Sequence, residues 1–231
     1  MPFLSLIVSA AVSAAPSACA AEVPLPPSAM AIVDDWDSAV ASADASELLT
    51  DATIEEKMRR LIVRDQITRA NLWRVDTADL ESCVKRALEV VIGERLRKID
   101  AQNTEALKKL LPADGWFRNS VHGRAITHGA WLIAQHSPDR QFRAYALEKQ
   151  KERLSSGDVD SRDYALTTDR VQLDLRLPQI YGSQAICVSG ELTLYPIGDP
   201  DGVDKRREEI GWAQTLAETK GDLEIGKPCE I

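Results

Sequence analysis

The sequence predicts an α+β protein: a mainly helical N-terminal part, followed by a small antiparallel β-sheet and a closing helix. Apolar residues recur at helical spacing up to about residue 157. From residue 169 to 177 apolar and polar residues alternate instead, and "AICV" and "LTLY" then flank a Ser189-Gly190 turn. The segment "VDKRREEIGWAQTLAET" returns to a helical pattern. The 231 residues suffice for one sizeable domain, or for one domain with an added element.

Two clear helices are expected before residue 100, after an Ala/Ser/Asp-rich helix at about 30–49. In "TIEEKMRRLIVRDQITRANLW", Thr53 and Glu56 have the spacing of a capping box. The stripe opposite its charged face contains Met58, Leu61, Ile62, Asp65 and Leu72. A second helix is expected from about 77 to 99, and the two helices are expected to pair as an antiparallel hairpin.

Shorter elements follow the hairpin. Asn103 is predicted to cap a separate helix, "TEALKKLL", which stops at the next proline. "NSVHGRAITHGAWLIAQHS" is apolar on nearly every side and predicts one buried helix, and "DRQFRAYALEKQKERLSSG" predicts an amphipathic one. The alternating stretch at 169–177 predicts a half-buried strand interrupted by Pro178. Asp201 is predicted to cap the closing helix.

The charge limits the partners. A formal net charge of -8 argues against nucleic acid or an anionic membrane surface as the main partner, because such binders need a large basic face. No nucleotide-binding, nucleophile-elbow or calcium-loop motif occurs in the sequence, so no cofactor is predicted. The expected partner is a polar ligand or another protein, of unknown identity.

Residues 1–20 are predicted to be a signal peptide. They contain no charged side chain, and Ala18-Cys19-Ala20 fits a cleavage site before Ala21. The apolar run is too short to span a bilayer, so no stable membrane span is expected after cleavage. Because a basic residue near the start is missing, a disordered Ala-rich tail or a misplaced start codon is the alternative. A lipoprotein is less favoured, since Pro16 replaces the expected aliphatic residue. We therefore expect a bacterial periplasmic or secreted protein with a Pro-rich linker at 21–29.

After such cleavage three cysteines remain: Cys83, Cys187 and Cys229. An odd number in an oxidising compartment allows one disulfide and leaves one thiol. Cys187–Cys229 is the favoured pair because the C-terminal tail otherwise lacks an anchor, and three unpaired thiols are the alternative. No CxxC or Cys/His spacing predicts structural zinc.

All three histidines lie between His122 and His136. On one helix, His128 and His136 would be about 12 Å apart along the axis, at roughly 1.5 Å per residue. Zinc ligands must lie within about 2 Å of one ion, so no shared metal site is predicted.

Three residues are the catalytic candidates: His136, Asp169 and Arg170. His136 is expected at the C-terminal end of a buried helix, where the dipole favours a protonated imidazole and a general acid or base could work. Asp169 and Arg170 are neighbours on a predicted strand, so one of them faces inward and needs a partner. Asp169 could orient His136, and Arg170 could stabilise an anion. The alternatives are a histidine bonded to the last helical carbonyls and an aspartate that caps a turn.

The substrate-binding candidates are Trp116, Gln135, Gln179, Tyr181, Gln184, Arg206 and Arg207. The stretch "QIYGSQ" offers neutral polar groups of the kind that bind sugars or peptides, although a satisfied sheet corner would have the same sequence. Arg206 and Arg207 fall in the first turn of a predicted helix, where the dipole disfavours cations. They are expected either to pair with nearby acids or to be held for an anion or a buried carboxylate such as Asp169.

The segments "GW", "AWLIAQH", "LTTDR", "QIYGSQ", "PIGDP" and "DKRREEIG" resemble, in this order, an uncharacterised bacterial domain-of-unknown-function family. Its motifs are GW(P), AWLxxQH, LxDR, QxYG(T/S)Q, PIxD and RRxxxG; the resemblance covers about residues 103–216 and leaves out the helical hairpin. It implies no activity. It implies that one constellation contains Trp116, Gln135, His136, Asp169, Arg170, Gln179, Tyr181, Gly182, Gln184, Asp199, Arg206 and Arg207. The chain departs from the pattern at Phe117, for proline, and at Ser183, for threonine.

Two functions fit these residues. One is a metal-independent hydrolase or lyase acting on a polar cell-envelope component, with His136 as acid or base and Asp169 as its orienting partner. The other, which we favour, is a non-catalytic exported binding or interaction module in which the same polar network is buried scaffolding. The expected organisation is a signal peptide (1–20), a linker (21–29), N-terminal helices (30–100), an α+β domain (101–221) and a tail (222–231).

Overall fold

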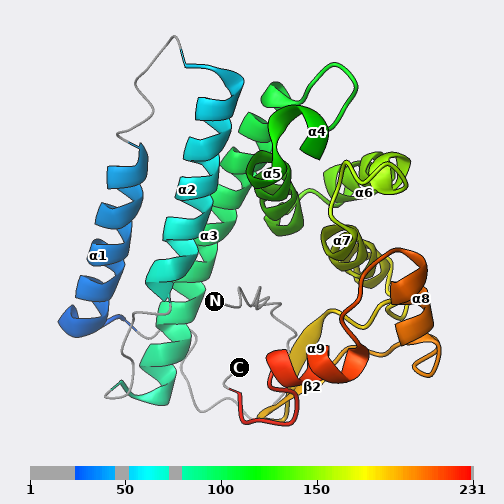
Figure 1. The fold of residues 1–231 in the computed structure, drawn as a ribbon. Coiled ribbons are helices and arrows are strands. Elements are labelled where there is room, and N and C mark those ends of the chain that lie inside the picture. Colours follow the sequence, from blue (N-terminus) through cyan, green and yellow to red (C-terminus); the bar gives the residue numbers. More distant parts are fainter. Residues whose placement is uncertain (1–23, 45–51, 73–79, 230–231) are drawn as a thin grey trace. The chain divides into compact units, whose positions relative to one another are not determined.

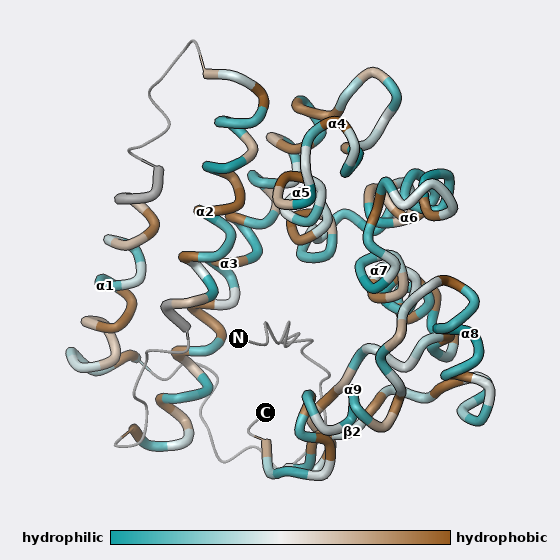
Figure 2. Tube along the Cα trace, in the orientation of Figure 1, coloured by the Kyte–Doolittle hydropathy of each residue, from teal (hydrophilic) through white to brown (hydrophobic). Residues whose placement is uncertain are grey.

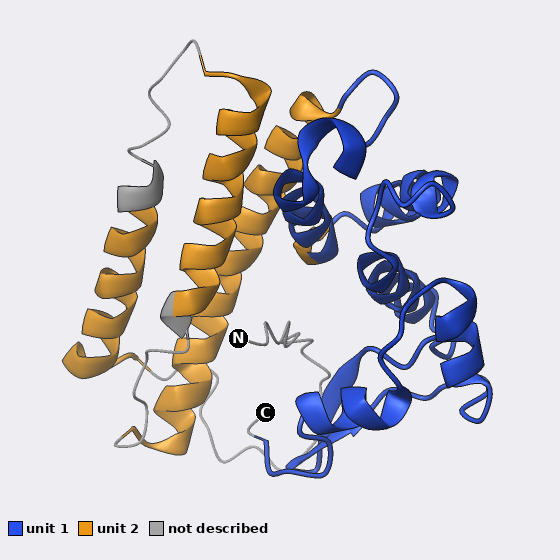
Figure 3. Ribbon diagram, in the orientation of Figure 1, with its two compact units in different colours: residues 1–9, 112–135, 139–231 blue, residues 10–111, 136–138 orange. Residues whose placement is uncertain are grey.

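The computed structural model describes residues 24–44, 52–72 and 80–229, so the predicted signal peptide lies outside the described residues (Figure 1). These residues are mostly helical, with one two-stranded antiparallel sheet followed by C-terminal helices, which confirms the α+β class. None of their helices is long and apolar enough to cross a membrane. They form two compact units (Figure 3). Unit 1 comprises 112–135 and 139–229, and unit 2 comprises the residues up to 111 together with 136–138.

Unit 2 contains three helices: α1 (Pro27–Asp44), α2 (Ile54–Leu72) and α3 (Ser82–Leu110). Helices α2 and α3 run antiparallel and pack against each other, so the predicted hairpin is confirmed (Figure 1). The predicted capping box is present: the Thr53 N–H donates to Glu56 Oε2 at 2.7 Å, and the Glu56 N–H donates to Thr53 Oγ1 at 3.2 Å. Two of the four unpaired amides at the start of α2 are thereby satisfied.

Two predictions for unit 2 were wrong. Helix α1 begins at Pro27, inside the stretch expected to be an extended linker, because proline is well suited to the first position of a helix. Asn103 does not cap a separate helix. It lies buried within α3 and accepts a hydrogen bond from Arg64 Nη1 of α2 at 3.0 Å, so this tertiary contact replaces the expected cap.

The core of unit 2 is formed by apolar residues of α1 and α3: Val33, Trp36, Val40, Leu88, Ile92 and Ile99. The alternation of hydrophobic and hydrophilic residues along these helices can be followed in Figure 2. Trp36 also joins α1 to α2, because its indole Nε1–H donates to the Thr68 carbonyl at 2.9 Å. The burial of one stripe of each helix stabilises the three-helix packing.

The helices of unit 1 are α4 (Asn119–His122), α5 (Arg124–His136), α6 (Arg140–Leu154) and α7 (Ser161–Asp174). The single helix expected over 119–137 is broken at Gly123, whose φ of 80° lies in the left-handed region. Helix α5 is buried over most of its surface, as predicted, and it ends at His136. The side chain of Asp139 caps α6 by accepting hydrogen bonds from the N–H groups of Gln141 and Phe142.

The strand predicted at 169–177 is wrong: most of this stretch is the end of α7. The side chain of Asp160 caps a helix that starts eight residues before the alternating pattern and continues into it. Within that pattern only Val171 of the four apolar residues is buried, and Leu175 and Leu177 are 62% and 48% exposed. The period-two pattern therefore does not mark a buried face.

Strands β1 (Ala185–Val188) and β2 (Glu191–Leu194) form the predicted hairpin, with Ala185 opposite Leu194 and Val188 opposite Glu191. The closing helix is split into α8 (Val203–Glu209) and α9 (Leu216–Asp222). Gly202, not Asp201, is the N-cap of α8. The chain leaves α8 through Gly211 with a φ of 80°, which ends the helix before the rest of the predicted pattern.

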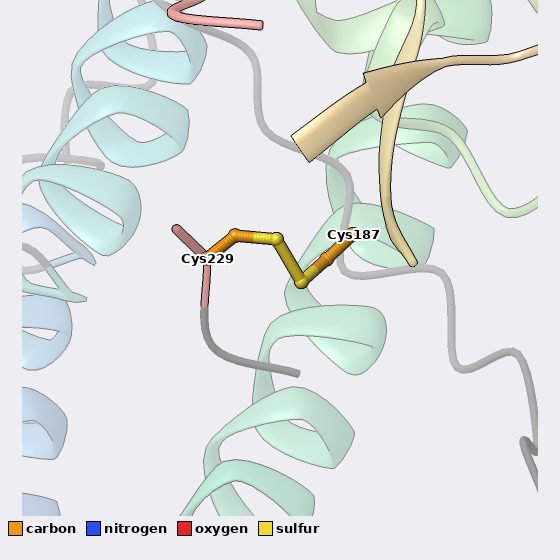
Figure 4. Close-up of a disulfide and its surroundings, with 2 residues drawn as sticks. All are labelled: Cys187 and Cys229. Carbon is orange, nitrogen blue, oxygen red and sulfur yellow. A yellow bond between two sulfur atoms is a disulfide. The ribbon is translucent and has the colours of Figure 1, made fainter. Parts of the chain in front are cut away.

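A disulfide joins Cys187 to Cys229, as predicted (Figure 4). It links β1 to the C-terminal tail, and the Cys229 N–H also donates to the Gly190 carbonyl at 2.9 Å. Cys83 is disulfide-bonded as well, and no described cysteine carries a free thiol. The expectation that one thiol remains concerns the chain after removal of residues 1–20, and it stays a prediction.

Candidate functional site

The turn at residues 179–184 is where most of the predicted site residues meet, and the buried carboxylate of Asp169 is at its centre. Asp169 Oδ1 accepts the N–H groups of Ile180 and Tyr181 at 2.8 and 2.9 Å. Its Oδ2 accepts both the N–H and the hydroxyl of Ser183 at 2.8 Å. The side chain is 0% exposed. The carboxylate therefore supplies the hydrogen-bond acceptors that the backbone of this buried turn requires.

The helical conformation of α7 explains this position. Helix α7 ends at Asp174, and the next residues turn the chain back, with Arg176 at a φ of 60°. Residues 180–183 consequently lie beside Asp169, which belongs to the last part of this helix. Burial raises the pKa of Asp169, while the hydrogen bonds from Tyr181, Ser183 and Ile180 act in the opposite direction.

Gln179 connects the turn to the hairpin. Its Nε2 donates to the carbonyls of Gln184 and Tyr195 at 3.0 and 2.9 Å, and its Oε1 accepts the Gln184 N–H at 2.6 Å. The Gln184 amide in turn donates to Ser183 Oγ at 3.0 Å. Both glutamine side chains are almost completely buried. Their polar groups are thus used within the protein.

Arg207 of α8 contacts the same turn through its carbonyls. Nε and Nη2 donate to the Tyr181 carbonyl at 2.9 and 2.6 Å. Nη1 donates to the carbonyl of Gln214 and the hydroxyl of Thr219, and the guanidinium stacks 3.9 Å from the centre of the Trp212 ring. Arg207 is 0% exposed, and burial lowers its pKa to about 10 against the opposing charges of Asp204 and Asp169.

Arg206 lies nearer the surface. Its Nε donates to the Ile180 carbonyl at 3.0 Å, and its Nη1 pairs with the Asp199 carboxylate at 2.8 Å. The two arginines are thus held by backbone carbonyls and by a nearby acid. Neither arginine pairs directly with Asp169, because the carboxylate oxygens of Asp169 accept hydrogen bonds from the N–H groups of the turn. We call Asp169, Gln179, Ser183, Gln184, Arg206 and Arg207 the turn cluster.

Tyr181 contributes its ring and its backbone. The side chain is 8% exposed, and its ring makes an edge contact with Tyr164 at 6.3 Å between centroids. Burial raises the pKa of its phenol to about 12. Its hydroxyl donates to no residue of the described part of the chain.

Gln135 and Arg170 form a separate pair. With its amide oxygen turned towards Arg170, Gln135 accepts from the guanidinium Nε and Nη2 at 3.3 and 3.2 Å. Gln135 is buried, and Arg170 is half-buried. Trp116 is fully buried, and its indole Nε1 has no hydrogen-bond partner among the described residues. The roles suggested for these three residues in binding or catalysis stay predictions.

His136 belongs to a second group of charged residues, within unit 2. Its Nδ1 lies 3.0 and 3.1 Å from the two carboxylate oxygens of Asp65. Asp65 also accepts from Arg69 Nη1 at 2.8 Å, and Arg69 Nη2 donates to both oxygens of Asp100 at 2.9 and 3.0 Å. We call these four residues the His136 cluster. The residue that orients His136 is therefore Asp65, and the prediction of Asp169 for that role was wrong.

The charges of the His136 cluster compensate one another. Burial opposes ionisation of Asp65, which is 1% exposed, but the charges of His136 and Arg69 outweigh it and lower the pKa of Asp65. At Asp100 burial dominates over the attraction of Arg69 and raises the pKa. Chemically, an ionised Asp65 fixes the imidazole of His136 in one orientation, as in an acid–base pair, although only 9% of the His136 side chain is exposed.

The sequence reading missed Asp65, Arg69 and Asp100 as members of a site. A signal was present, because Asp65 interrupts the apolar stripe of its helix and a carboxylate on a buried face needs a partner. Arg69 follows one turn later on the same face. Asp100 lies on a different helix, α3, so its contact with Arg69 could not be predicted from the spacing of residues. In the described part of the chain, no three His, Cys, Asp or Glu side chains are grouped so as to hold a metal ion.

Residues 59–223 match the Family of unknown function (DUF6624). The chain belongs to this family. The DUF6624 match begins inside α2 and includes all of α3, so the helical hairpin is part of the family region and the narrower resemblance over 103–216 was incomplete. Both the turn cluster and the His136 cluster lie within the DUF6624 region. No curated protein and no solved structure matches the chain at a significant level.

Proposed function

We propose that this member of DUF6624 is an exported, non-catalytic binding or interaction module whose buried polar clusters stabilise its fold. The observation that carries the proposal is the environment of Asp169. Its carboxylate is 0% exposed and accepts four hydrogen bonds from the turn. A catalytic carboxylate must reach the substrate, whereas a buried carboxylate with this set of partners stabilises the segment that surrounds it.

The neighbours of Asp169 support the same conclusion. Arg207 is 0% exposed and donates to three carbonyls and one hydroxyl of the protein. Gln179 is 1% exposed and bonded through both ends of its amide. Residues that bind a substrate need polar groups directed at open space. The partner of the module is therefore expected at a different surface.

Export is part of the proposal. The pattern of residues 1–20 is that of a signal peptide. The Cys187–Cys229 disulfide is in keeping with an oxidising compartment, such as the periplasm or the extracellular medium, where such bonds persist. We also propose a division into N-terminal helices and an α+β domain; the predicted boundary between residues 100 and 101 falls inside α3, whereas the two compact units divide between residues 111 and 112.

A second candidate function is a metal-independent hydrolase or lyase acting on a polar envelope component. The specific observation in its favour is the 3.0 Å contact between His136 Nδ1 and the ionised Asp65, which replaces the predicted partner Asp169. Such a pair is typical of a general base. The low exposure of both side chains is the reason for ranking it second.

Substitution of Asp169 by asparagine tests the proposal, with Asp201→Asn as the matched control on an exposed aspartate. The variant places an amide N–H₂ against donors of the turn, which costs about 1–3 kcal/mol for each unsatisfied group. We expect the melting temperature to fall by several degrees and the amides of residues 180, 181 and 183 to lose hydrogen-exchange protection. Asp201→Asn should change neither quantity.

The opposite result would favour catalysis. Active-site charges are commonly destabilising, so replacing one leaves the stability unchanged or raises it. An Asp169→Asn protein as stable as the wild type would therefore contradict the scaffold role. Export is tested separately by expressing the full chain in bacteria and sequencing the N-terminus of the protein in the periplasmic fraction. We expect it to begin at Ala21, and an uncleaved chain found only in the cytoplasm would contradict export.

A further inference from the structure

A groove of about 420 Å³ lies within unit 1 at the first turns of α5 and α7. Its lining residues are Arg124, Ala125, His128, Asp160, Arg162 and Asp163. None of them belongs to the turn cluster or to the His136 cluster. The His128 side chain is 40% exposed, compared with 9% for the His136 side chain. The volume is within the range of small-molecule sites, about 300–1,000 Å³.

His128 is held in one orientation. Its Nδ1 lies 2.7 Å from Oδ2 of Asp163, which is only 4% exposed. Its ring stacks on Trp131 with 4.8 Å between centroids, and the Trp131 indole is fixed by a 3.0 Å hydrogen bond to Thr167 Oγ1. The other ring nitrogen, Nε2, has no hydrogen-bond partner in the described part of the chain. A positioned imidazole thus lines the groove and has one nitrogen without a hydrogen-bond partner among the described residues.

The charged groups of the groove differ in whether they have a partner within the protein. Asp160 accepts the backbone N–H of Arg162 at 2.9 Å and pairs with Arg124, and Asp163 pairs with His128. Both carboxylates are therefore engaged. The guanidinium of Arg162 pairs with no residue among those the structure describes. When His128 is protonated, the two arginines and the imidazolium exceed the two carboxylates by one positive charge.

We infer that this groove binds an oxyanion, the carboxylate or phosphate group of a small ligand, through His128 Nε2–H and the Arg162 guanidinium. Asp163 accepts the Nδ1–H of the imidazolium, which leaves Nε2–H as a donor towards the groove. Guanidinium and imidazolium donors to an oxyanion form strong, charge-assisted hydrogen bonds. This inference rests on the proposed binding function and names its ligand class.

The three histidines of the chain allow a direct test, because their imidazole NMR signals can be assigned with single His→Asn variants. The full chain is titrated with inorganic phosphate and, separately, with acetate at constant ionic strength. We expect the His128 signals to shift in a saturable way while those of His122 and His136 do not. A response to phosphate alone, or to acetate alone, identifies which oxyanion the groove accepts, and either supports the inference.

Arg162→Gln provides the decisive variant, since the half-buried guanidinium forms no ion pair with the residues that the structure describes and so has no such partner to lose. We expect the dissociation constant of the anion to rise about tenfold or more, as for the loss of a charge-assisted hydrogen bond. Lys151→Gln is the matched control, because it removes one positive charge from an exposed position of α6. It should leave the affinity unchanged.

Three results would overturn the inference: no saturable shift of His128 with either anion, unchanged affinity in Arg162→Gln, or equal weakening in Lys151→Gln. The last would show a response to net charge only. These failures are distinguishable from failure of the proposed function, since they leave the effect of Asp169→Asn on stability as it is. An Asp169→Asn protein of unaltered stability would, conversely, contradict the scaffold role without changing anion binding.

Discussion

Asp169 and Arg207 bind the same turn through opposite groups of its backbone. Asp169 accepts N–H groups of the turn, and Arg207 donates to the carbonyls of Tyr181 and Gly182. A buried turn cannot satisfy these groups by itself, and each ion supplies what the backbone lacks. Because burial lowers the pKa of Arg207 while the Asp169 charge raises it, the two ions also stabilise each other across the turn. Loss of either one leaves unpaired backbone groups and an uncompensated buried charge.

Arg207→Lys should be strongly destabilising although it keeps the charge. A lysine ammonium has no planar fork, so it cannot reach the Tyr181 carbonyl, the Gln214 carbonyl and the Thr219 hydroxyl together, and it loses the stacking on Trp212. We expect the free energy of unfolding to fall by roughly 3 kcal/mol. Chemical denaturation measures the change. Arg140→Lys is the control on a 73% exposed side chain and should cost almost nothing; similar effects of the two variants would contradict the prediction.

Gly182→Ala should destabilise the turn through a steric clash. Gly182 has a φ of 66°, and a Cβ there would lie 2.8 Å from Ile197 Cδ1 and 2.9 Å from Leu216 Cδ1. Gly190→Ala is the control: it has a φ of 84° and no atom within 4 Å of the added Cβ. In both variants the alanine must adopt a left-handed backbone conformation, which costs about 1 kcal/mol. Because both contacting atoms are terminal methyls of side chains that can shift, we expect Gly182→Ala to cost about 1 kcal/mol more in thermal or chemical unfolding, the low end of the cost of overpacking. Equal costs would show that the turn has room.

Asp65 should make the stability of unit 2 depend on pH. Its pKa is lower in the folded protein than in the unfolded chain, because His136 and Arg69 outweigh burial. The stabilisation from Asp65 is therefore fully present above the unfolded value, about 3.9, and is lost as the pH falls through the lower folded value. The difference in unfolding free energy between wild type and Asp65→Asn should be largest near pH 7, roughly 3 kcal/mol, and should shrink below about pH 4.

Denaturation at a series of pH values measures this difference. Asp37→Asn is the control within unit 2, since Asp37 is 48% exposed and its ion pair with Arg95 lies at the surface. It should give a difference of less than about 1 kcal/mol at every pH. An Asp65→Asn difference that is constant between pH 7 and pH 3 would mean that Asp65 is not ionised preferentially in the folded state.

The double variant Cys187→Ser/Cys229→Ser should be less stable than the wild type, because the disulfide closes a loop between residues 42 apart. The loop-entropy relation gives an upper value of about 4 kcal/mol. We expect a shift of the denaturation midpoint without reductant. With reductant present the two proteins should unfold alike, since neither then has this bond, whatever happens at Cys83. A double variant as stable as the oxidised wild type would contradict the prediction.

Local signals were enough for several elements. The capping box at Thr53 and Glu56 lies within one helical turn, so its residues interact whatever the rest of the chain does. The hairpin at 185–194 is likewise set by adjacent strands and a two-residue turn. The strand predicted at 169–177 failed because alternation over a few residues is also compatible with a helix, and the cap at Asp160 had already started one.

The sequence predicted which residues meet in the turn cluster, but it did not predict what they do there. Asp169, Gln179, Gln184 and Arg207 do meet, but their polar groups point at backbone atoms of the protein. A sequence records which polar groups exist and not which way they face. The pairing of His136 with Asp65 illustrates the same limit, because the two residues are 71 positions apart.

The sequence by itself determined the α+β class and the helical hairpin, since these follow from periodicity and composition. It favoured the Cys187–Cys229 pair without deciding it, because three unpaired thiols fitted the same cysteine positions. Only the tertiary structure decided which carboxylate pairs with His136. It also decided that Asp169 accepts the backbone N–H groups of a turn, and that His128 rather than His136 lines a groove. The physical reason is that burial and hydrogen-bond direction depend on segments far apart in the chain, and they decide whether a polar side chain stabilises the fold or remains available to a ligand.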